Sequence, residues 1–383
     1  MKTAFTIIVP MYNVGREIHR CLSSLRTQTY PEFEVLLLDD GSTDDTVSIC
    51  RETAARDSRF RLIENPHHGT ASPLRNLGIR LASKEYIVFL DGDDEILADS
   101  LECFSSAVER YGAPDVLGAG VCSGSLNAEG VFQENGRTFN FSSRDGVRTG
   151  IQALERLFLQ HKTLACYSCG NIYRRQFLIG KQLFQREDIR LLEDHEWLPR
   201  VLLSADRVAA VEHPYYHYIR RPGSVTTALT DRGLEDIAGV VNSLAAYGCA
   251  YQERMPETVR RFWAAHALNA FFWYFFNPLY EDKFTFPVWR SKLERFWGIL
   301  KTGKIFSGFS VMRPKRNSLL CPGFCWLGKG YACLRICISG NSITGSASEN
   351  ESSEPYLKFS KVRSSPLMSM KKNPRTASRI STG

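Results

Sequence analysis

Three carboxylates that could do chemistry, Asp91, Asp93 and Asp94, follow an apolar run over residues 86–90. A short apolar run that ends in a turn signal is typical of a buried strand. Carboxylates this close repel one another unless solvent or a cation neutralises them. Divalent Mg²⁺ and Mn²⁺ take oxygen ligands and are often shared with substrate phosphates. The alternative is a solvated acidic turn that leads into a helix after Asp99, and the motif by itself does not choose between them.

Two further polar clusters follow predicted strands. Tyr12 and Asn13 come after the run 5–10, and Asp39 and Asp40 come after the run 33–38. In parallel sheets, ligands bind outside the carboxyl ends of the strands. We therefore expect all the clusters, including the one after residue 90, to converge on one edge of a sheet.

A second acidic pair, Glu193 and Asp194, introduces a predicted helix. Acidic side chains at a helix start interact favourably with the helix dipole, and this stabilising role is an alternative to a catalytic one. A carboxylate placed there could equally serve as a general base. Successive helical residues point about 100° apart. We therefore expect only one of these two carboxylates to face the cleft.

The elements that must position these residues alternate between strands and helices. This order predicts an α/β fold with a mostly parallel central sheet flanked by helices. Residues 123–147 are rich in Gly, Ser and Asn and predict a loop or hairpin, and residues 235–247 and 261–276 predict helices. The expected strands cover 5–10, 33–38, 61–63, 86–90, 115–117 and 207–211, and the expected helices between them cover 14–28, 45–56, 72–81 and 99–110.

Length and composition indicate a soluble globular protein of 383 residues, with 43% hydrophobic and 23% charged residues. Eleven scattered cysteines and no visible secretory signal favour a reducing cytosol and free thiols. Cys166 and Cys169 form a C-x-x-C motif without a second pair nearby, so core cysteines are favoured over zinc. The same preference applies to the two C-x-x-x-C pairs within residues 321–337.

Charge is distributed unevenly along the chain. From Lys301 onward there are 14 Lys and Arg against 3 Asp and Glu, and the preceding residues carry 34 against 38. A basic tail predicts either an anionic partner surface or a solvated segment without a partner. The aromatic segment 264–276 is too interrupted for a membrane span, which needs about 20 apolar residues. It favours a helix packed on the sheet domain or lying at a membrane interface.

Four motifs, in this order and at this spacing, resemble the family 2 glycosyltransferases. They are residues 7–13 (IIVPMYN), 39–44 (DDGSTD), 75–79 (RNLGI) and 91–94 (DGDD). The resemblance continues more loosely to about Thr227. It implies a GT-A nucleotide-sugar-binding fold over residues 1–228. Beyond it we expect a helical C-terminal region over 229–340 and a disordered basic tail over 341–383.

The resemblance also implies roles for individual residues. Asp91 would face the donor sugar, and Asp93 would ligate a divalent cation, Mn²⁺ or Mg²⁺, with help from Asp94. Asp194 would be the catalytic base that faces the cleft, and we expect Glu193 to bind a neighbouring loop through Arg220 or Arg221. The residues implied along the nucleotide are Pro10, Tyr12 and Asp39 at the nucleoside, with Asp40 and Arg75 beside them. The sequence departs from the family pattern at Gly92 and at His67-His68-Gly69, and neither departure removes a catalytic type of residue.

The implied activity is inverting, metal-dependent transfer of a sugar from a nucleoside-diphosphate sugar, UDP-linked, to a glycan or lipid-linked acceptor in bacterial cell-surface polysaccharide synthesis. We expect a cytoplasmic protein that touches the inner face of the plasma membrane through its basic C-terminal region and binds no nucleic acid. Two alternatives remain. A nucleotidyltransferase would normally have a Gly-rich basic loop after the first strand, which residues 11–15 do not supply. The other is a non-catalytic sugar-nucleotide-binding protein.

Overall fold

The computed structural model describes residues 2–160, 163–220, 231–276, 291–292 and 295. All of them belong to one structural unit, Met1–Gly323. The expectations for the C-terminal cysteines, the basic tail and residues 221–224 of the basic loop fall outside the described residues.

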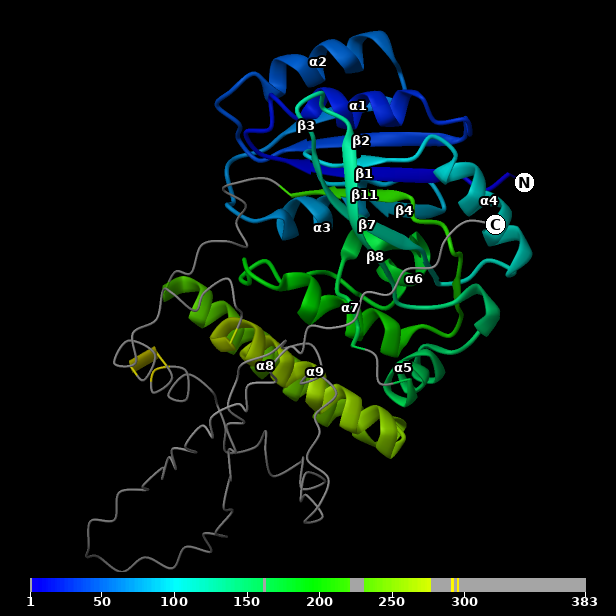
Figure 1. Ribbon diagram of the computed structural model, residues 1–383, viewed down its shortest axis with the longest axis vertical. Helices are drawn as coiled ribbons and strands as arrows, with labels where there is room; N and C mark the ends of the chain where they lie inside the picture. Colours follow the sequence, from blue (N-terminus) through cyan, green and yellow to red (C-terminus); the bar gives the residue numbers. More distant parts are fainter. Residues whose placement is uncertain (1, 161–162, 221–230, 277–290, 293–294, 296–383) are drawn as a thin grey trace, which may run out of the picture. The chain divides into compact units, whose positions relative to one another are not determined.

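A seven-stranded sheet forms the centre of the described chain (Figure 1), in the order β10-β6-β9-β4-β1-β2-β3. Its strands are β1 (Phe5–Met11), β2 (Phe33–Asp39), β3 (Phe60–Glu64), β4 (Tyr86–Phe89), β6 (Val116–Gly118), β9 (Asn171–Arg174) and β10 (Val208–Ala210). Every pairing is parallel except those of β9, which runs antiparallel to both β4 and β6. The predicted mostly parallel sheet is confirmed, and β9 is the strand that the alternation of elements did not anticipate.

A smaller sheet packs beside the first and has the order β5-β11-β7-β8. Its strands are β5 (Glu95–Ile96), β7 (Gly120–Leu126), β8 (Phe132–Phe139) and β11 (Tyr216–Ile219). The segment predicted as a loop or hairpin is therefore the β7-β8 hairpin. Because β5 follows the acidic turn directly and pairs with β11, this sheet also supports that turn.

Alternate residues of the central strands feed two apolar cores, one on each face. On β1, Ile7 and Val9 pack with α1 and α4, whereas Ile8 packs with α3, α7, α8 and α9. This period-2 alternation explains why the inner strands are apolar throughout, since both of their faces are covered. The helices are α1 (Ile18–Arg26), α2 (Thr46–Arg56), α3 (Ala71–Leu81), α4 (Ser100–Arg110), α5 (Gly150–Leu159), α6 (Arg175–Gly180), α7 (Glu193–Ser204), α8 (Asp231–Tyr251) and α9 (Glu257–Phe276), with short 3₁₀ turns at Ser143–Asp145, Ser168–Gly170 and Gln252–Arg254.

The helices α8 and α9 lie side by side next to α5 and α7 (Figure 1). Leu234, Leu244 and Trp263 belong to the same buried core as Ile8 of the sheet. The C-terminal helices therefore complete one face of the sheet domain. Among the described residues, no helix combines the length and apolarity needed to cross a membrane.

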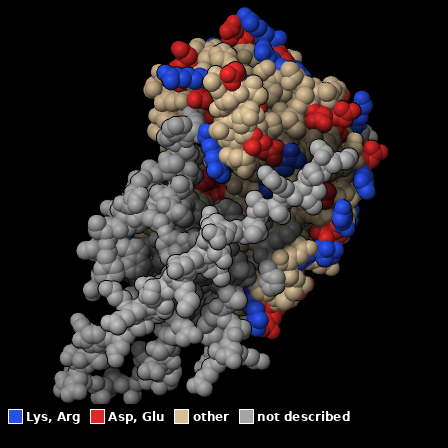
Figure 2. Space-filling model, viewed as in Figure 1, with Lys and Arg blue, Asp and Glu red and all other residues tan. Residues whose placement is uncertain are grey.

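Acidic and basic side chains are interspersed over the described surface visible in Figure 2. Nucleic-acid-binding proteins typically gather their basic residues into a patch or stripe. The visible face has no such arrangement among its described residues.

Candidate active site

The acidic turn lies at the carboxyl end of β4 and presents its carboxylates in different directions. Asp94 points inward and is 1% exposed. Its two carboxylate oxygens accept hydrogen bonds from the Tyr216 hydroxyl at 2.6 Å and the Ile219 backbone N–H at 2.8 Å. Burial, followed by the charges of Asp93 and Asp91, raises the pKa of Asp94 well above its usual range. Asp94 therefore ties the turn to β11, and Asp91 and Asp93 are left partly exposed at the edge of the sheet.

The acidic turn is also joined to β1. The Gly92 N–H donates to the Pro10 carbonyl at 3.2 Å. A Cβ at Gly92 would lie 3.0 Å from the Met11 Cβ, tighter than an ordinary contact. The absence of a side chain at residue 92 therefore lets the turn pack directly against the end of β1.

Arg75 of α3 is buried at the centre of three carboxylates. One terminal nitrogen donates to Asp91 Oδ1 at 2.9 Å, and the other donates to Glu193 Oε1 at 3.1 Å and Asp194 Oδ1 at 3.2 Å. Burial opposes the charge of Arg75, but the three carboxylates outweigh it and raise the guanidinium pKa. Arg75, which the resemblance places beside the nucleotide, thus bridges the acidic turn and the start of α7.

Both acids at the start of α7 reach the same nitrogen of Arg75. The expected partner of Glu193 on the neighbouring loop is Arg220 or Arg221. Among the described residues Glu193 pairs with Arg75, and Arg221 lies outside them. Burial raises the pKa of the Glu193 carboxyl to about 7, with the Asp194 charge adding to the shift and Arg75 opposing it. Glu193 can therefore change protonation near neutral pH.

Asp194 is held by several donors besides Arg75. It accepts hydrogen bonds from the Ser168 N–H at 2.9 Å, from the Ser168 hydroxyl and from Gln185 Nε2 at 3.3 Å. Ser168 and Gln185 are buried, and Gln185 Nε2 donates a hydrogen bond to the Ser168 hydroxyl at 2.8 Å. Sequence reasoning missed both residues, because neither lies in a recognisable motif and only the folded chain brings them to Asp194.

Asp39, at the end of β2, has one carboxylate oxygen that accepts hydrogen bonds and one for which the described residues offer no partner. Its Oδ2 accepts from the N–H groups of Gly41 and Ser42 at 2.9 and 3.0 Å. Its Oδ1 is buried and has no hydrogen-bond partner among the described residues. A buried acceptor without a partner is costly unless a ligand supplies a donor. Asp39 therefore fits a contact with an N–H group of a bound nucleobase.

Asp40 organises the loop that carries the two adjacent histidines. Its Oδ1 accepts from the N–H of His68 at 2.8 Å and its Oδ2 accepts from the N–H of Gly69 at 3.0 Å. The His67 ring stacks on the Tyr12 ring, with centroids 4.3 Å apart and planes inclined by 28°. Tyr12 is 43% exposed. The pair therefore forms an accessible aromatic surface next to Asp39.

The chemistry of the donor set suits a divalent cation at Asp93. Hard cations take carboxylate oxygens and keep several positions for water and substrate phosphate. Asp93 supplies a partly exposed carboxylate, and Asp91 lies beside it with one oxygen on Arg75. Asp94, the other expected ligand, accepts one hydrogen bond at each of its two oxygens.

Comparison with known proteins agrees with this geometry. Residues 6–180 match the model of the family described as "Glycosyl transferase family 2". This region, a little under half of the chain, is thus similar to glycosyltransferase family 2. The matched region contains the acidic turn, Asp39 and Arg75, but it ends before Asp194 and the helices α7, α8 and α9.

Two curated relatives are bacterial. The chain is 32% identical over 222 residues to the "Uncharacterized glycosyltransferase EpsJ" of Bacillus subtilis, covering 58% of this chain and 62% of EpsJ. It is 28% identical over 229 residues to the glycosyltransferase GlyG of Streptococcus pneumoniae, covering 59% of this chain and 73% of GlyG. The chain therefore spans a little under two thirds of EpsJ.

Among solved structures, the Staphylococcus aureus protein TarS, residues 1–349, in complex with UDP-GlcNAc shares the fold. The TM-score is 0.60 at 24% identity, and the similarity covers 78% of this chain and 82% of that chain. This likeness extends beyond the region matched by the family model. It confirms the expected GT-A architecture.

Proposed function

We propose that this chain is an inverting glycosyltransferase that moves a sugar from a UDP-sugar to a hydroxyl group of a glycan or lipid-linked acceptor. The observation that carries the proposal is the arrangement at the sheet edge. A buried acceptor, Asp39, lies at the carboxyl end of β2. The Arg75 bridge joins the acidic turn at the carboxyl end of β4 to the hydrogen-bonded carboxylate of Asp194. The match of residues 6–180 to glycosyltransferase family 2 supports the reaction class.

The donor end of the reaction would use the edge formed by β1 and β2. The free Oδ1 of Asp39 would accept a hydrogen bond from an N–H such as the one on a uracil ring. Tyr12 would stack on the base, because an exposed aromatic ring offers a sequence-independent platform for a nucleobase. The solved complex of TarS with UDP-GlcNAc supports UDP as the nucleotide to test first.

The chemical step would use Asp194 as the general base. The carboxylate takes the proton of the acceptor hydroxyl while that oxygen attacks the anomeric carbon from the face opposite the departing UDP. General-base assistance is typically worth about 10²–10⁴-fold in rate. Ser168, Gln185 and Arg75 would hold the carboxylate in place, and Arg75 would also orient Asp91 toward the donor.

A divalent cation, Mn²⁺ or Mg²⁺, would be held by Asp93 with Asp91 beside it. It would supply Lewis-acid stabilisation of the negative charge that develops on the diphosphate. Asp94 would contribute by fixing the turn to β11 through Tyr216 and Ile219.

The acceptor is proposed only as a class. TarS is named as a poly(ribitol-phosphate) beta-N-acetylglucosaminyltransferase, and this supports a polymer acceptor in cell-surface polysaccharide synthesis.

The proposal is tested by screening nucleotide sugars, with UDP-GlcNAc first, in the presence of Mn²⁺ or Mg²⁺. We expect one UDP-sugar to raise the melting temperature, because a ligand that binds only the folded state stabilises it. The same donor should release UDP slowly by hydrolysis, and excess chelator should abolish the release. Binding without UDP release would indicate a sugar-nucleotide-binding protein, and formation of a nucleotidyl product would indicate a nucleotidyltransferase. Full activity in excess chelator would overturn the metal assignment.

A further inference from the structure

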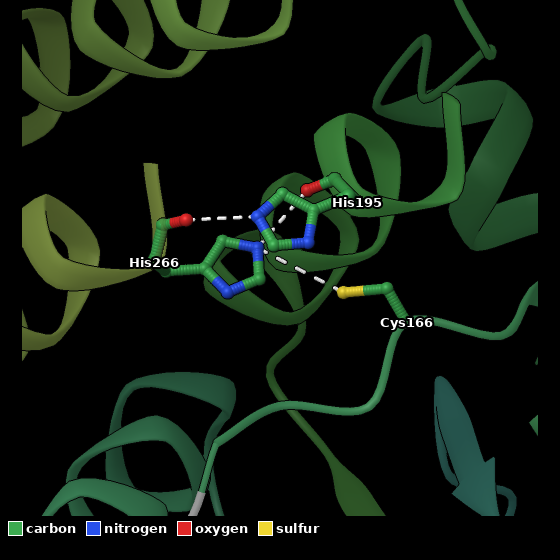
Figure 3. A group of neighbouring side chains, drawn as sticks. All are labelled: Cys166, His195 and His266. Carbon is green, nitrogen blue, oxygen red and sulfur yellow. Dashed lines mark hydrogen bonds between the residues drawn. The ribbon is translucent and has the colours of Figure 1, made fainter. Parts of the chain in front are cut away.

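Two buried histidines from distant parts of the chain stack face to face behind the active site. His195 lies in the first turn of α7 and His266 lies in α9, and their ring centroids are 3.7 Å apart with planes inclined by 12° (Figure 3). His195 Nε2 lies 2.8 Å from the His266 carbonyl oxygen, and His266 Nε2 lies 3.0 Å from the His195 carbonyl oxygen. A carbonyl oxygen only accepts, so each Nε2 carries the hydrogen and donates it.

Burial keeps both rings neutral at physiological pH. It lowers the pKa of His195 to about 4. It also lowers the pKa of His266 well below its usual range, and the neighbouring His195 ring adds to that shift. The two rings therefore form a reciprocal pair of hydrogen bonds between neutral groups.

Cys166 joins the pair, since its Sγ lies 3.8 Å from His266 Nε2 (Figure 3). One cysteine and two histidines are common zinc ligands, and their ligand atoms lie within 4.8 Å of one another. However, both Nε2 atoms already donate to carbonyl oxygens, and a nitrogen that carries a hydrogen cannot ligate a metal. The lone pairs of two nearly parallel stacked rings also do not converge on one point. The three residues therefore form a packed contact between segments.

His266 contacts the start of α7, which carries Asp194, and the segment around residues 166–168, which donates hydrogen bonds to Asp194. His195 follows Asp194 directly in the chain, and its carbonyl oxygen receives the hydrogen bond from His266. Cys166 lies two residues before Ser168, whose N–H and hydroxyl both donate to Asp194. His266 of α9 thus contacts both the helix start that carries Asp194 and the segment that donates hydrogen bonds to it.

The start of α7 lacks the usual local support. The residue before the helix, Leu192, has a φ of 63°, in the left-handed region, and no side chain caps the first turn. A bulky non-glycine residue in this region is strained unless its surroundings hold it. The first turn of α7 therefore depends on contacts from elsewhere in the fold.

We propose that His266, acting through His195 and Cys166, is a positioning residue that holds Asp194 in place for proton transfer. The proposal rests on the proposed function, in which Asp194 is the base. It assigns part of the active-site framework to α9, a helix outside the region 6–180 that matches the family model.

The test compares two substitutions of His266 with UDP-GlcNAc as the donor, or with whichever UDP-sugar the donor screen identifies. His266→Phe keeps the stacked ring but removes the N–H, whereas His266→Gln keeps an N–H at a similar position. We expect His266→Phe to lower kcat for UDP release by about 10- to 100-fold, as for a small displacement of a catalytic group. The donor Kd should change less than about twofold, and His266→Gln should restore most of kcat.

The pH profile separates positioning from general stability. Asp194 would lose hydrogen-bond donors that favour its charged form, so the acidic limb of kcat should move to higher pH in His266→Phe. The matched control is Trp263→Phe, which removes a buried ring N–H donated from the same helix to the Leu244 carbonyl at 2.7 Å. That bond joins α9 to α8 and does not involve α7, so the control should leave the pH profile unchanged.

A loss of kcat in Trp263→Phe equal to that in His266→Phe would overturn the proposal, as would equal kcat in the Phe and Gln variants. If His266→Phe does not fold, His195→Phe removes the other hydrogen bond of the pair and serves as the second variant. Stoichiometric zinc in the purified protein would show that the three residues are ligands and would also overturn the proposal.

Hydrogen exchange gives a readout that does not depend on the reaction. His266→Phe should speed amide exchange in residues 193–200 and 166–170 by about 10-fold or more, and it should leave β4 unchanged. If no UDP-sugar is bound or hydrolysed by the wild-type protein, the proposed function fails, while the exchange result still decides whether His266 holds these segments. Unchanged exchange in both segments would overturn the positioning role.

Discussion

Asp39 and Asp194 are both buried or half-buried carboxylates at one sheet edge, but they are held in different ways. Asp39 accepts from backbone N–H groups two and three residues farther along the chain. Asp194 accepts from Ser168, Gln185 and Arg75, and Arg75 is separated from it by 119 positions. On the proposed nucleotide side of the site, Asp39 is thus held by a local turn, whereas Asp194, on the proposed base side, is held by contacts that exist only in the completed fold.

This difference predicts how each side responds to change. A local turn keeps its geometry as long as its own few residues remain. A carboxylate held by distant partners depends on the burial and charge balance of the whole cluster. The predictions below test this contrast, from the largest expected effect to the smallest.

Removing the Arg75 side chain should have the largest effect, because Arg75 connects the acidic turn after β4 to the start of α7. Arg75→Ala leaves Asp91, Glu193 and Asp194 close together without their shared cation. Breaking a buried ion pair by removing one partner costs about 3–5 kcal/mol, and we expect a loss of that size in the free energy of unfolding. Denaturant unfolding measures it.

The matched control is Arg51→Ala, which removes an exposed arginine paired with Glu64. Exposed pairs contribute about 0–1 kcal/mol, so this variant should lose little stability. A similar small loss in Arg75→Ala would contradict the view that the base side is a buried charge cluster.

Asp194→Asn should separate catalysis from donor binding. The amide keeps the size of the side chain but cannot take a proton, so turnover should fall by about 10²-fold or more. The donor Kd should stay nearly unchanged, because the proposed nucleotide contacts lie at β1 and β2. Steady-state UDP release and calorimetric donor titration measure the two quantities.

Glu193→Gln is the companion variant and should slow turnover less than Asp194→Asn. If Glu193→Gln were the slower of the two, Glu193 would be the base and the mechanism would otherwise stand. If neither change slowed transfer, a carboxylate base would have to be abandoned.

Tyr12→Ala should weaken the nucleotide side alone. Stacking of a base on an aromatic ring contributes about 1–3 kcal/mol, so the donor Kd should rise by roughly 5-fold or more. Turnover at saturating donor should be unchanged, and Tyr12→Phe should behave like the wild type. A fall in saturated turnover without a change in Kd would place Tyr12 on the base side.

The smallest predicted effect is a pH dependence of stability that arises from Glu193. Its pKa is raised from an ordinary 4.5 to about 7 in the folded state, so the folded protein binds this proton more tightly than the unfolded chain does. The resulting stabilisation is present below about pH 4.5 and is lost as the pH rises through 7. Glu193→Gln removes it.

Unfolding free energies of the wild type and Glu193→Gln, measured at pH 5 and pH 8, test this sign. The wild type should lose at least about 1 kcal/mol more than the variant between the two values, since one pKa unit corresponds to about 1.36 kcal/mol. An equal loss in both proteins would mean that Glu193 stays ionised throughout.

The same contrast explains how far the sequence could be interpreted. Apolar runs predicted all six expected strands to within one or two residues, because a buried strand needs a continuous apolar segment. The placement of Asp39 and the acidic turn at one edge followed from parallel topology. These features depend on short stretches of chain and on a general rule of sheets.

The details that sequence reasoning missed all depend on long-range packing. Nothing near Asp94 indicated that Tyr216 and Ile219 would turn it inward, since those partners lie more than 120 residues away. Ser168 and Gln185 are ordinary polar residues outside any motif, and the antiparallel strand β9 brings Ser168 to the site. The stack of His67 on Tyr12 likewise joins two loops that the sequence treats separately.

The shared core of α8 and α9 with the central sheet has a consequence for synthesis on the ribosome. Translation proceeds at about 5–20 residues per second, so roughly 5–20 s pass between synthesis of residue 180 and residue 276. During that interval the nascent chain already contains the proposed nucleotide-binding edge, while one face of its sheet is still uncovered and α9 has not yet been made. A nascent chain at this stage would present apolar surface to chaperones and could bind a nucleotide before it could support catalysis.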